Sequence, residues 1–316
     1  MVTPASTPAP TPAPTPAPSA RSGALLGIAA FGVWGLFPLF FDALAPAGAI
    51  EVLTHRIVWA FLVCVVAVTA LRRWGRVRRL LADPGSCALL VAAAILIAVN
   101  WGVYVHAVGT GHVLDASLGY FVNPLVTVLI AVVVLGERLR TLQWVAIGVG
   151  AVAVTVLTVE VGRVPWIALT LAFSFGFYGL LKNKLAGRAG GGVDALTGLA
   201  AETTVLFPVA LVGLVVLHAG GTATFATAGA GHALLLVAAG PLTVLPLLLF
   251  ALAAGRVALS TLGLVQYLTP VLQLLCGLWL GERMLPAQWI GFGLIWGALL
   301  LLSADALRAG RRPLPA

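Results

Sequence analysis

Apolar residues fill long stretches of the chain, and charged residues or clusters of Gly and Pro separate these stretches. Most stretches are close to the length of about 20 residues that an α-helix needs to cross a bilayer. Breaking the chain at charges and at Gly/Pro clusters predicts ten membrane helices. They cover about 23–44, 51–71, 87–108, 112–135, 142–159, 165–185, 194–217, 232–254, 258–280 and 286–306.

The composition narrows the class to integral membrane proteins. Of the 316 residues, 61% are hydrophobic and 9% are charged. Soluble domains carry about 25% charged residues, so this chain has too few to cover a surface that faces water. The first twenty residues are a Pro/Ala/Thr repeat that cannot bury a core, and we interpret 1–20 as a disordered tail.

The positions of the basic residues predict how the helices cross the membrane. The formal net charge is +8, with 18 Lys and Arg against 10 Asp and Glu. With the amino terminus in the cytoplasm, fifteen basic residues fall on the cytoplasmic side: Arg21, Arg72, Arg73, Arg76, Arg78, Arg79, Arg138, Arg140, Lys182, Lys184, Arg188, Arg256, Arg308, Arg311 and Arg312. Arg163 and Arg283 fall outside, and Arg56 lies within the second helix. This positive-inside pattern places both termini in the cytoplasm and accounts for the basic excess without a nucleic acid partner.

One ten-residue stretch occurs twice in similar form. Residues 135–144 (LGERLRTLQW) and 280–289 (LGERMLPAQW) share six letters at the same places, 145 positions apart. The copies follow the predicted fourth and ninth helices, so each closes the fourth helix of a five-helix unit. Because five is odd, the second unit enters the membrane in the opposite sense, as in many secondary transporters. We expect Glu137 with Arg138, and Glu282 with Arg283, to form ion pairs in these loops.

The repeat defines the expected fold class and domains. The fold is an all-α integral membrane fold, in which ten transmembrane helices form two inverted five-helix repeats. The parts are a disordered tail at 1–20, a first repeat at 21–160, a second repeat at 161–308 and a cytoplasmic tail at 309–316.

Several longer motifs resemble those of a known family. They are 51–56 (EVLTHR), 100–101 (NW), 116–125 (ASLGYFVNPL), 171–180 (LAFSFGFYGL), 259–263 (LSTLG) and 266–267 (QY). With the two GER loops, they resemble the RarD-like branch of the EamA-type drug/metabolite transporter (DMT) superfamily, and the likeness extends over about 21–308. The resemblance implies a multi-pass permease of the cytoplasmic membrane that works as an exporter. The group is associated with chloramphenicol sensitivity.

Polar and aromatic side chains on several predicted helices are candidates for binding a substrate. They are Trp34, Asn100, Tyr120, Asn123, Tyr178, Gln266 and Tyr267. Their similar depth on different helices suits a cavity with mixed apolar and polar walls. The alternative is that the Asn and Gln side chains join helices by hydrogen bonds.

Four ionisable residues inside predicted helices are candidates for gating or coupling: Glu51, His55, Arg56 and Glu202. Glu51 and His55 are one turn apart and share a helix face, and Arg56 beside them could attract an anion near the outer mouth. Alternatively, Arg56 pairs with Glu51 or Glu202 in a structural cluster. Glu202 is the only acid near the middle of its half. An isolated carboxylate there favours the neutral form, so we predict that it carries a coupling proton. A structural bond to Arg56 or to a hydroxyl is the other interpretation.

These features predict a secondary-active permease rather than an enzyme. It would export a small amphipathic metabolite or drug by alternating access, with proton coupling left open. The alternative is an integral-membrane enzyme that acts on a lipid-soluble substrate, but the sequence has no HExxH, GxSxG or acidic metal motif. It also has no P-loop. We expect no cofactor and no metal, and a small-molecule substrate and membrane lipid as partners. The sequence leaves a homo-oligomer open.

Overall fold

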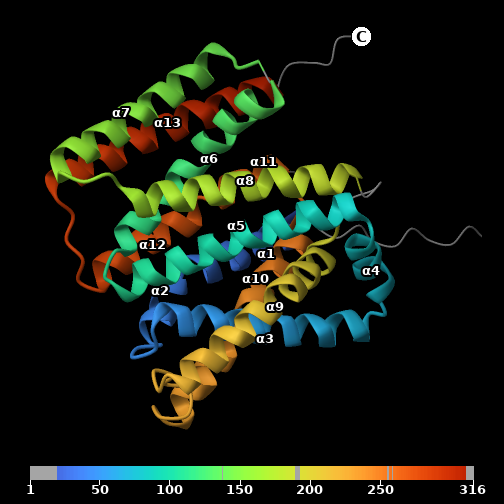
Figure 1. Ribbon diagram of the computed structural model, residues 1–316. Helices are drawn as coiled ribbons and strands as arrows, with labels where there is room; N and C mark the ends of the chain where they lie inside the picture. Colours follow the sequence, from blue (N-terminus) through green and yellow to red (C-terminus); the bar gives the residue numbers. More distant parts are fainter. Residues whose placement is uncertain (1–19, 137, 189–192, 255, 258, 311–316) are drawn as a thin grey trace, which may run out of the picture.

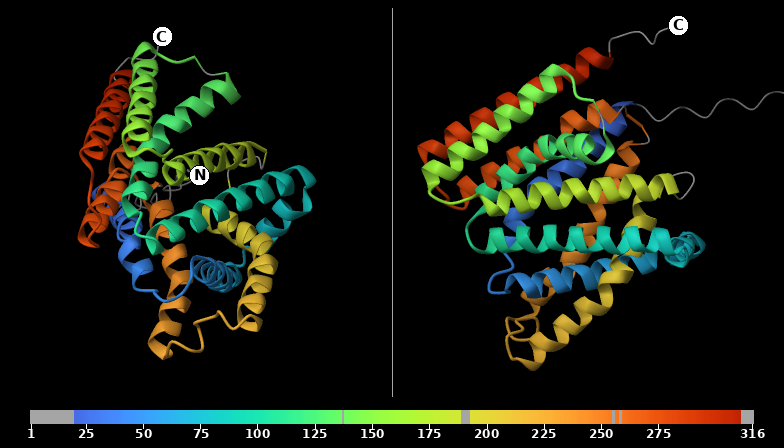
Figure 2. Two further views of the ribbon diagram at one scale, coloured as in Figure 1. Left: turned by 60° about the vertical axis from the view of Figure 1, so that its left-hand side comes forward. Right: turned by 45° about the horizontal axis from the view of Figure 1, so that its top comes forward.

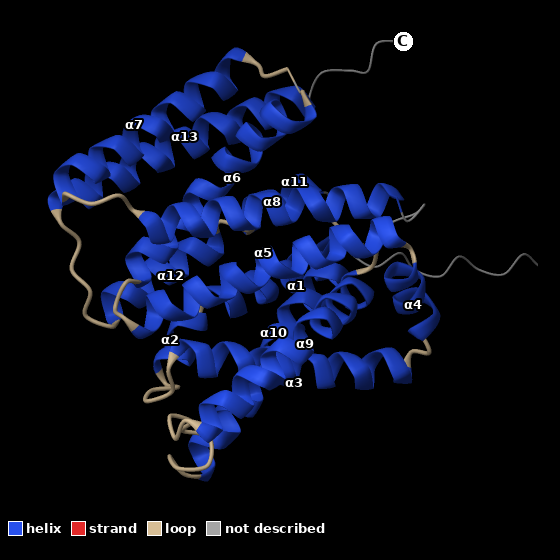
Figure 3. Ribbon diagram, in the orientation of Figure 1, coloured by secondary structure: helices blue, strands red, loops and turns tan. Residues whose placement is uncertain are grey.

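The computed structural model describes residues 20–310, apart from 137, 189–192, 255 and 258. Within these residues the chain is helical and contains no strand (Figure 3). The helices are α1 (Ala20–Gly35), α2 (Phe37–Asp42), α3 (Ala49–Ala70), α4 (Trp74–Ala82), α5 (Pro84–Gly109), α6 (Val113–Leu135), α7 (Thr141–Val161), α8 (Trp166–Arg188), α9 (Ala195–Ala219), α10 (Ala230–Ala254), α11 (Leu259–Val265), α12 (Leu268–Trp279) and α13 (Pro286–Gly310). The predicted all-helical class is confirmed.

Among the described residues, nine helical spans are long and apolar enough to cross a membrane. Two of them each contain a pair of helices, α1 with α2 over Arg21–Asp42, and α11 with α12 over Thr261–Trp279. The chain is therefore a multi-pass membrane protein. The ten predicted segments all coincide with helices, but α8 is not among the nine spans. Its last two turns carry Lys182, Lys184 and Arg188, and its crossing of the membrane stays a prediction.

The first span is broken at Leu36, where the sequence predicted one continuous helix. Pro38 in the first turn of α2 has no N–H, so the carbonyl of Trp34 loses its helical partner. The side-chain nitrogen Nε2 of Gln273, on α12, lies 3.4 Å from that carbonyl and donates to it. A side chain from the second half of the chain thus donates the hydrogen bond that Pro38 cannot supply in the first span.

Helix α4 is a short helix between the predicted segments 51–71 and 87–108, where the sequence predicted no helix. It runs across the ends of α3 and α5 (Figure 1). Val77 and Leu80 are buried, while Arg76 and Arg79 are exposed, so one face packs on the bundle and the other is basic. We call this side of the molecule the α4 end. The other side, with the α2–α3, α5–α6, α9–α10 and α12–α13 connections, is the opposite end (Figures 1 and 2).

Helices pack mainly against helices from the other half of the sequence. Helix α3 lies against α9 and α10, α5 against α8 and α9, α6 against α8 and α12, α7 against α13, and α1 against α10 and α12 (Figure 2). Small residues permit the closest approaches. At Gly119 an added Cβ would lie 2.8 Å from the Ala168 carbonyl oxygen, so α6 and α8 can meet there only with Gly.

Candidate functional site

A buried guanidinium lies among α2, α3, α5 and α10, toward the opposite end. Arg56 is seven residues into α3, about 10 Å from the start of that helix. Arg56 exposes 3% of its surface to solvent. Its Nε donates a hydrogen bond to the Thr243 hydroxyl of α10 at 2.8 Å. The atom Cζ lies 4.3 Å from the ring centre of Trp101, 5.3 Å from that of Phe41 and 5.5 Å from that of Phe37. The Nη1 atom is buried and has no hydrogen-bond partner in the part of the chain that the structure describes.

The carboxylate of Glu51 does not neutralise this guanidinium. It accepts hydrogen bonds from the backbone amides of Thr224 at 2.7 Å and Phe225 at 3.0 Å, and from the Thr224 hydroxyl at 2.9 Å. The same hydroxyl lies 2.8 Å from Nε2 of His232. Glu51 therefore fastens the α9–α10 connection to the start of α3, and the alternative in which Arg56 pairs with Glu51 is wrong.

His55 supports the same connection rather than pairing directly with Glu51. Its Nδ1 accepts a hydrogen bond from the indole N–H of Trp59 at 3.1 Å. Its ring is stacked on Phe225 with the ring centres 4.7 Å apart. The shared helix face of Glu51 and His55, which the spacing predicts, thus carries the α9–α10 connection.

Asn100 joins three helices and has its polar atoms satisfied. Its amide nitrogen donates to the Leu171 carbonyl and to the Ser174 hydroxyl of α8, each at 3.0 Å. Its oxygen accepts from the Tyr120 hydroxyl of α6 at 3.2 Å. In this conformation Asn100 and Tyr120 form an interhelical link, as the alternative interpretation of Asn in membrane helices expects.

Two further buried polar atoms lack hydrogen-bond partners among the described residues: the hydroxyl of Tyr104 and Oε1 of Gln273. The Tyr104 ring packs on Phe41, with ring centres 5.9 Å apart, and on Tyr120 at 5.7 Å. The Phe41 ring also lies 5.3 Å from the Cζ of Arg56, so Tyr104 and the guanidinium share this neighbour. Unpaired buried polar atoms are rare in folded proteins, and two of them, on Arg56 and Tyr104, lie beside the same Phe41 ring.

Glu202 is not isolated, which corrects the expectation from sequence. Its Oε1 lies 2.7 Å from Nζ of Lys182 on α8, and the Tyr178 hydroxyl donates to its two oxygens at 3.4 and 3.2 Å. Lys182, which lies within the predicted helix 165–185 and was assigned to the cytoplasmic side, reaches inward from α8 to Glu202. The alternative pairing of Glu202 with Arg56 is wrong, because the carboxylate is bound to Lys182.

The remaining predicted residues do not converge on one point. Trp34 packs on Phe31 and Phe250. Asn123 is half-buried, and its Oδ1 has no hydrogen-bond partner. Gln266 is exposed at the α11–α12 break, and Tyr267 packs with the apolar cluster of α6, α7, α12 and α13. The structure thus groups Asn100, Tyr120 and Arg56 near one another, and Tyr178 with Glu202.

Several residues of these clusters were missed from sequence. Phe37, Phe41 and Tyr104 are ordinary aromatic residues in apolar helices, and only the fold brings them to Arg56. Lys182 offered a signal, because it stands four residues after Tyr178 and both can therefore face one partner.

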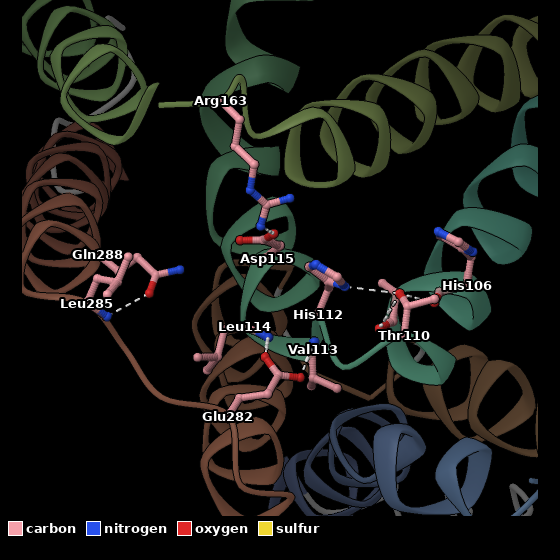
Figure 4. A network of polar contacts seen from close by, with 11 residues as sticks. His106, Thr110, His112, Val113, Leu114, Asp115, Arg163, Glu282, Leu285 and Gln288 are labelled. Atoms are coloured by element: carbon pink, nitrogen blue, oxygen red, sulfur yellow. Dashed lines mark hydrogen bonds and ion pairs between the residues drawn. The ribbon is translucent and has the colours of Figure 1, made fainter. Parts of the chain in front are cut away.

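A polar network closes the opposite end (Figure 4). The carboxylate of Glu282, in the α12–α13 connection, accepts from the backbone amides of Val113 at 2.5 Å and Leu114 at 2.9 Å. Close by, Arg163 pairs with Asp115 at 3.1 Å. Glu282 therefore caps α6 instead of forming the expected ion pair with Arg283. Its counterpart Glu137 lies outside the described residues, so the predicted pair with Arg138 has no structural account.

Ion pairs also join the segments at the α4 end. Asp194, the residue before α9, bonds Arg73 at 3.1 Å and Arg76 at 3.2 Å. Burial raises the pKa of Asp194, but hydrogen bonds from Thr197 and Arg76 and the charge of Arg73 together hold it below its usual value.

A second pair at this end links α8 to the start of α5. Arg188 bonds Asp83 at 2.8 Å. The Arg188 hydrogen bond, with those from Ser86, lowers the pKa of Asp83 well below its usual range. The α3–α4–α5 segment is thereby tied to α8 and α9 by charges on exposed or half-buried side chains.

Comparison with known proteins agrees with this architecture. Residues 21–159 match the EamA-like transporter family. A protein named RarD from Streptomyces exfoliatus is 54% identical over 293 residues, which cover 92% of this chain and 91% of that protein. An uncharacterized transporter of Vibrio cholerae is 44% identical over 292 residues, covering 92% and 95%. One crystal structure superposes with a TM-score of 0.56 at 19% identity, covering 92% of this chain and 99% of that chain, which shows a shared fold alone.

The apolar helices and the matched family define a multi-pass membrane transporter. More particularly, the chain belongs to the RarD-like branch of the EamA-like transporter family.

Proposed function

We propose that the protein is a secondary-active permease that exports a small amphipathic solute by alternating access. The observation that carries the proposal is the buried polar cluster around Arg56. It lies between helices of the two halves, since Arg56 of α3 is held by Thr243 of α10. Charged groups inside membrane proteins are costly and usually mark a solute or ion pathway.

Two inverted five-helix repeats, 21–160 and 161–308, are the architecture we propose for this permease, with α8 as the tenth span. The helix pairings support it, because each has an equivalent when the two halves are exchanged. For example, α3 with α10 is matched by α9 with α5, and α6 with α8 by α12 with α1. Arg56 stands seven residues after Ala49, and Glu202 stands seven residues after Ala195, so the two buried charges hold equivalent positions.

The proposal extends to proton coupling through Glu202. A carboxylate paired with Lys182 is stable in a closed protein, whereas water entering from the α4 end would weaken the pair. Such separation would let the carboxylate exchange a proton with the cytoplasm. At the opposite end, Glu51 and His55 would act as a gate, because they hold the α9–α10 connection over the cluster.

The protein would lie in the cytoplasmic membrane with both termini inside. The exposed arginines Arg76 and Arg79 of α4 support this orientation, since basic residues concentrate on the cytoplasmic side. Trp34, Asn123, Tyr178, Gln266 and Tyr267 would line the solute path in other conformations of the transport cycle.

The alternative is an integral-membrane enzyme. Recovery of the solute in chemically unchanged form distinguishes a permease from such an enzyme. Metabolite profiling of cells with and without the gene would first identify solutes whose export depends on the protein. Purified protein in vesicles would then be loaded with such a solute, with chloramphenicol as a first neutral probe. A permease returns the solute chemically unchanged on the other side of the membrane. A converted product, or no movement of any solute from the profile, would refute the proposal.

Glu202→Gln tests the coupling step in the same vesicles. The Gln side chain keeps the shape and the neutral state but cannot release a proton. We expect gradient-driven accumulation to be lost while exchange without a gradient continues. Accumulation by the Gln variant under a pH gradient would assign coupling to another group or indicate a passive carrier.

A further inference from the structure

The Arg56 cluster lacks a negative charge. Among the described residues, Arg56 forms no ion pair, and its described hydrogen bond is the one to the neutral Thr243 hydroxyl. The nearest acid on its own helix, Glu51, is occupied by the amides of Thr224 and Phe225. A buried guanidinium without a counter-ion is unfavourable, because desolvation weakens the charged group and nothing nearby neutralises it.

Three aromatic rings partly replace that counter-ion. Trp101, Phe41 and Phe37 turn toward the guanidinium at 4.3, 5.3 and 5.5 Å. Cation–π contacts stabilise a desolvated cation but leave its N–H groups without acceptors, as Nη1 shows. The rings can also face the apolar or aromatic part of a solute once the cluster opens.

The unpaired groups of Arg56 and Tyr104 can both donate hydrogen bonds. Nη1 of Arg56 is a donor, and the Tyr104 hydroxyl can donate as well. Both are buried, and both residues pack on the ring of Phe41, 5.3 Å from the Arg56 Cζ and 5.9 Å from the centre of the Tyr104 ring. Two donors, one of them cationic, fit the two oxygens of a carboxylate better than any neutral group.

The geometry points to a solute that is an organic carboxylate with an apolar or aromatic body. Arg56 and Tyr104 bind its carboxylate, and Trp101, Phe41 and Phe37 pack on its body. This inference rests on the proposed permease function and names the solute class for the same site. In this conformation the aromatic rings cover the guanidinium. When the site opens, the carboxylate takes their place on the guanidinium and the rings pack on the body of the solute.

Binding of three matched probes to the full-length protein in detergent tests the assignment. Phenylacetate carries the carboxylate, phenylacetamide is its neutral analogue and phenethylamine is its cationic analogue. A ligand that binds the folded state raises the thermal unfolding midpoint. We expect phenylacetate to raise it, and the amide, the amine and sodium chloride at the same concentration not to do so.

Variants then connect the effect to the cluster. Arg56→Gln should weaken phenylacetate binding by about tenfold or more and remove the preference over the amide. Arg79→Gln, which removes an exposed arginine from α4, should bind like the unchanged protein. Arg56→Met should abolish phenylacetate binding while unfolding at the same temperature as the unchanged protein or above it, since an unpaired buried charge is removed. If Arg56 had only a structural role, Arg56→Met would instead lower the unfolding temperature and leave phenylacetate binding in place.

Tyr104→Phe covers the case in which the Arg56 variants do not fold. It removes one donor only and should weaken phenylacetate binding several-fold. The inference is overturned if phenylacetate gives no shift, if the amide or amine matches it, or if its effect persists in Arg56→Gln. A vesicle experiment distinguishes failure of the carboxylate assignment from failure of the proposed permease function. If a neutral solute crosses unchanged and Arg56→Gln leaves its rate unaltered, the permease stands and the carboxylate assignment falls.

Discussion

The carboxylate of Glu282 binds the amide of Val113, 169 residues earlier in the chain, at 2.5 Å (Figure 4). It also accepts from Leu114 at 2.9 Å, so one side chain satisfies two amides at the start of α6. A carboxylate at a helix N-terminus is favoured by the helix dipole and by these charge-assisted bonds. The duplicated GER loop thus has a physical role in its second copy, because it fastens the α12–α13 connection to the first half.

Glu282→Ala should lower stability and loosen the opposite end. Loss of a capping side chain costs about 0.5–2 kcal/mol, so the thermal unfolding midpoint in detergent should fall. A cysteine placed at Thr110, at the end of α5, should also react faster with a thiol reagent. Glu160→Ala is the matched control, because Glu160 is an exposed carboxylate near the end of α7. Equal effects of the two substitutions would contradict the capping role.

The Lys182–Glu202 pair should behave as one unit in a double-mutant cycle. Lys182→Met leaves the buried carboxylate of Glu202 unpaired, which costs about 3–5 kcal/mol. Glu202→Gln should cost less, because the Lys182 side chain is 25% exposed. Glu202→Gln and Lys182→Met should each lower the unfolding midpoint, and the double variant should be more stable than the sum of the single losses predicts. Lys184→Met, from the exposed side of α8, should have little effect. Additive single effects would mean that the two side chains do not interact.

Most of the fold could be predicted from the sequence because a membrane helix is a local pattern. Helix length and the charges between helices placed all ten segments on observed helices. The break at Leu36 was missed, since a Pro in a membrane helix is tolerated when another helix supplies a donor. That donor, Gln273, lies far away in sequence. Helix α4 was missed because its apolar face is only two residues, Val77 and Leu80.

The candidate site was less predictable, because partners depend on tertiary packing. The sequence marked Arg56 and Glu202 as buried charges, and both are buried. It named Arg56 or a hydroxyl as the structural partner of Glu202, and the Tyr178 hydroxyl is such a partner. The pairing with Arg56 is wrong, since helix contacts between the halves set these distances. The sequence placed Lys182 near the cytoplasmic end of a predicted helix, but it did not show that the long side chain reaches Glu202 of α9.

Asn100 and Asn123 should respond differently to truncation. Asn100→Ala leaves the Tyr120 hydroxyl and the Ser174 hydroxyl without their amide partner, and each lost buried bond costs about 1–3 kcal/mol. Asn123→Ala removes an amide whose Oδ1 has no partner, so the unfolding midpoint should change little while transport falls. Both effects are measured by thermal unfolding and vesicle transport. A large loss of folded protein for Asn123→Ala would assign it to structure instead.

The ion pairs at the α4 end should persist through mild acidification. Their carboxylates have a lowered pKa in the folded protein. Their contribution is therefore complete above the usual Asp pKa of about 4 and is lost only as the pH falls through the lowered folded pKa. Hydrogen exchange of α4 amides should show steady protection from neutral pH to about pH 5 once intrinsic exchange is corrected. Asp194→Asn should reduce this protection at neutral pH, whereas Asp42→Asn, at the opposite end, should not. Equal protection in the Asp194 variant would show that the pairs contribute nothing there.

The orientation of the protein is testable by cysteine accessibility. Cys64 and Cys276 are buried and Cys87 is half-buried, so a Cys87→Ser background leaves little reactive thiol. In that background, Arg283→Cys should react with a membrane-impermeant thiol reagent in intact cells, because the α12–α13 connection is predicted to face outward. Arg76→Cys on α4 should react only after the cells are opened. Both side chains are exposed in the structure, so a difference between them reports the side of the membrane and not burial. The reverse pattern would invert the protein in the membrane, place the Arg56 cluster near the cytoplasm and overturn the proposed orientation.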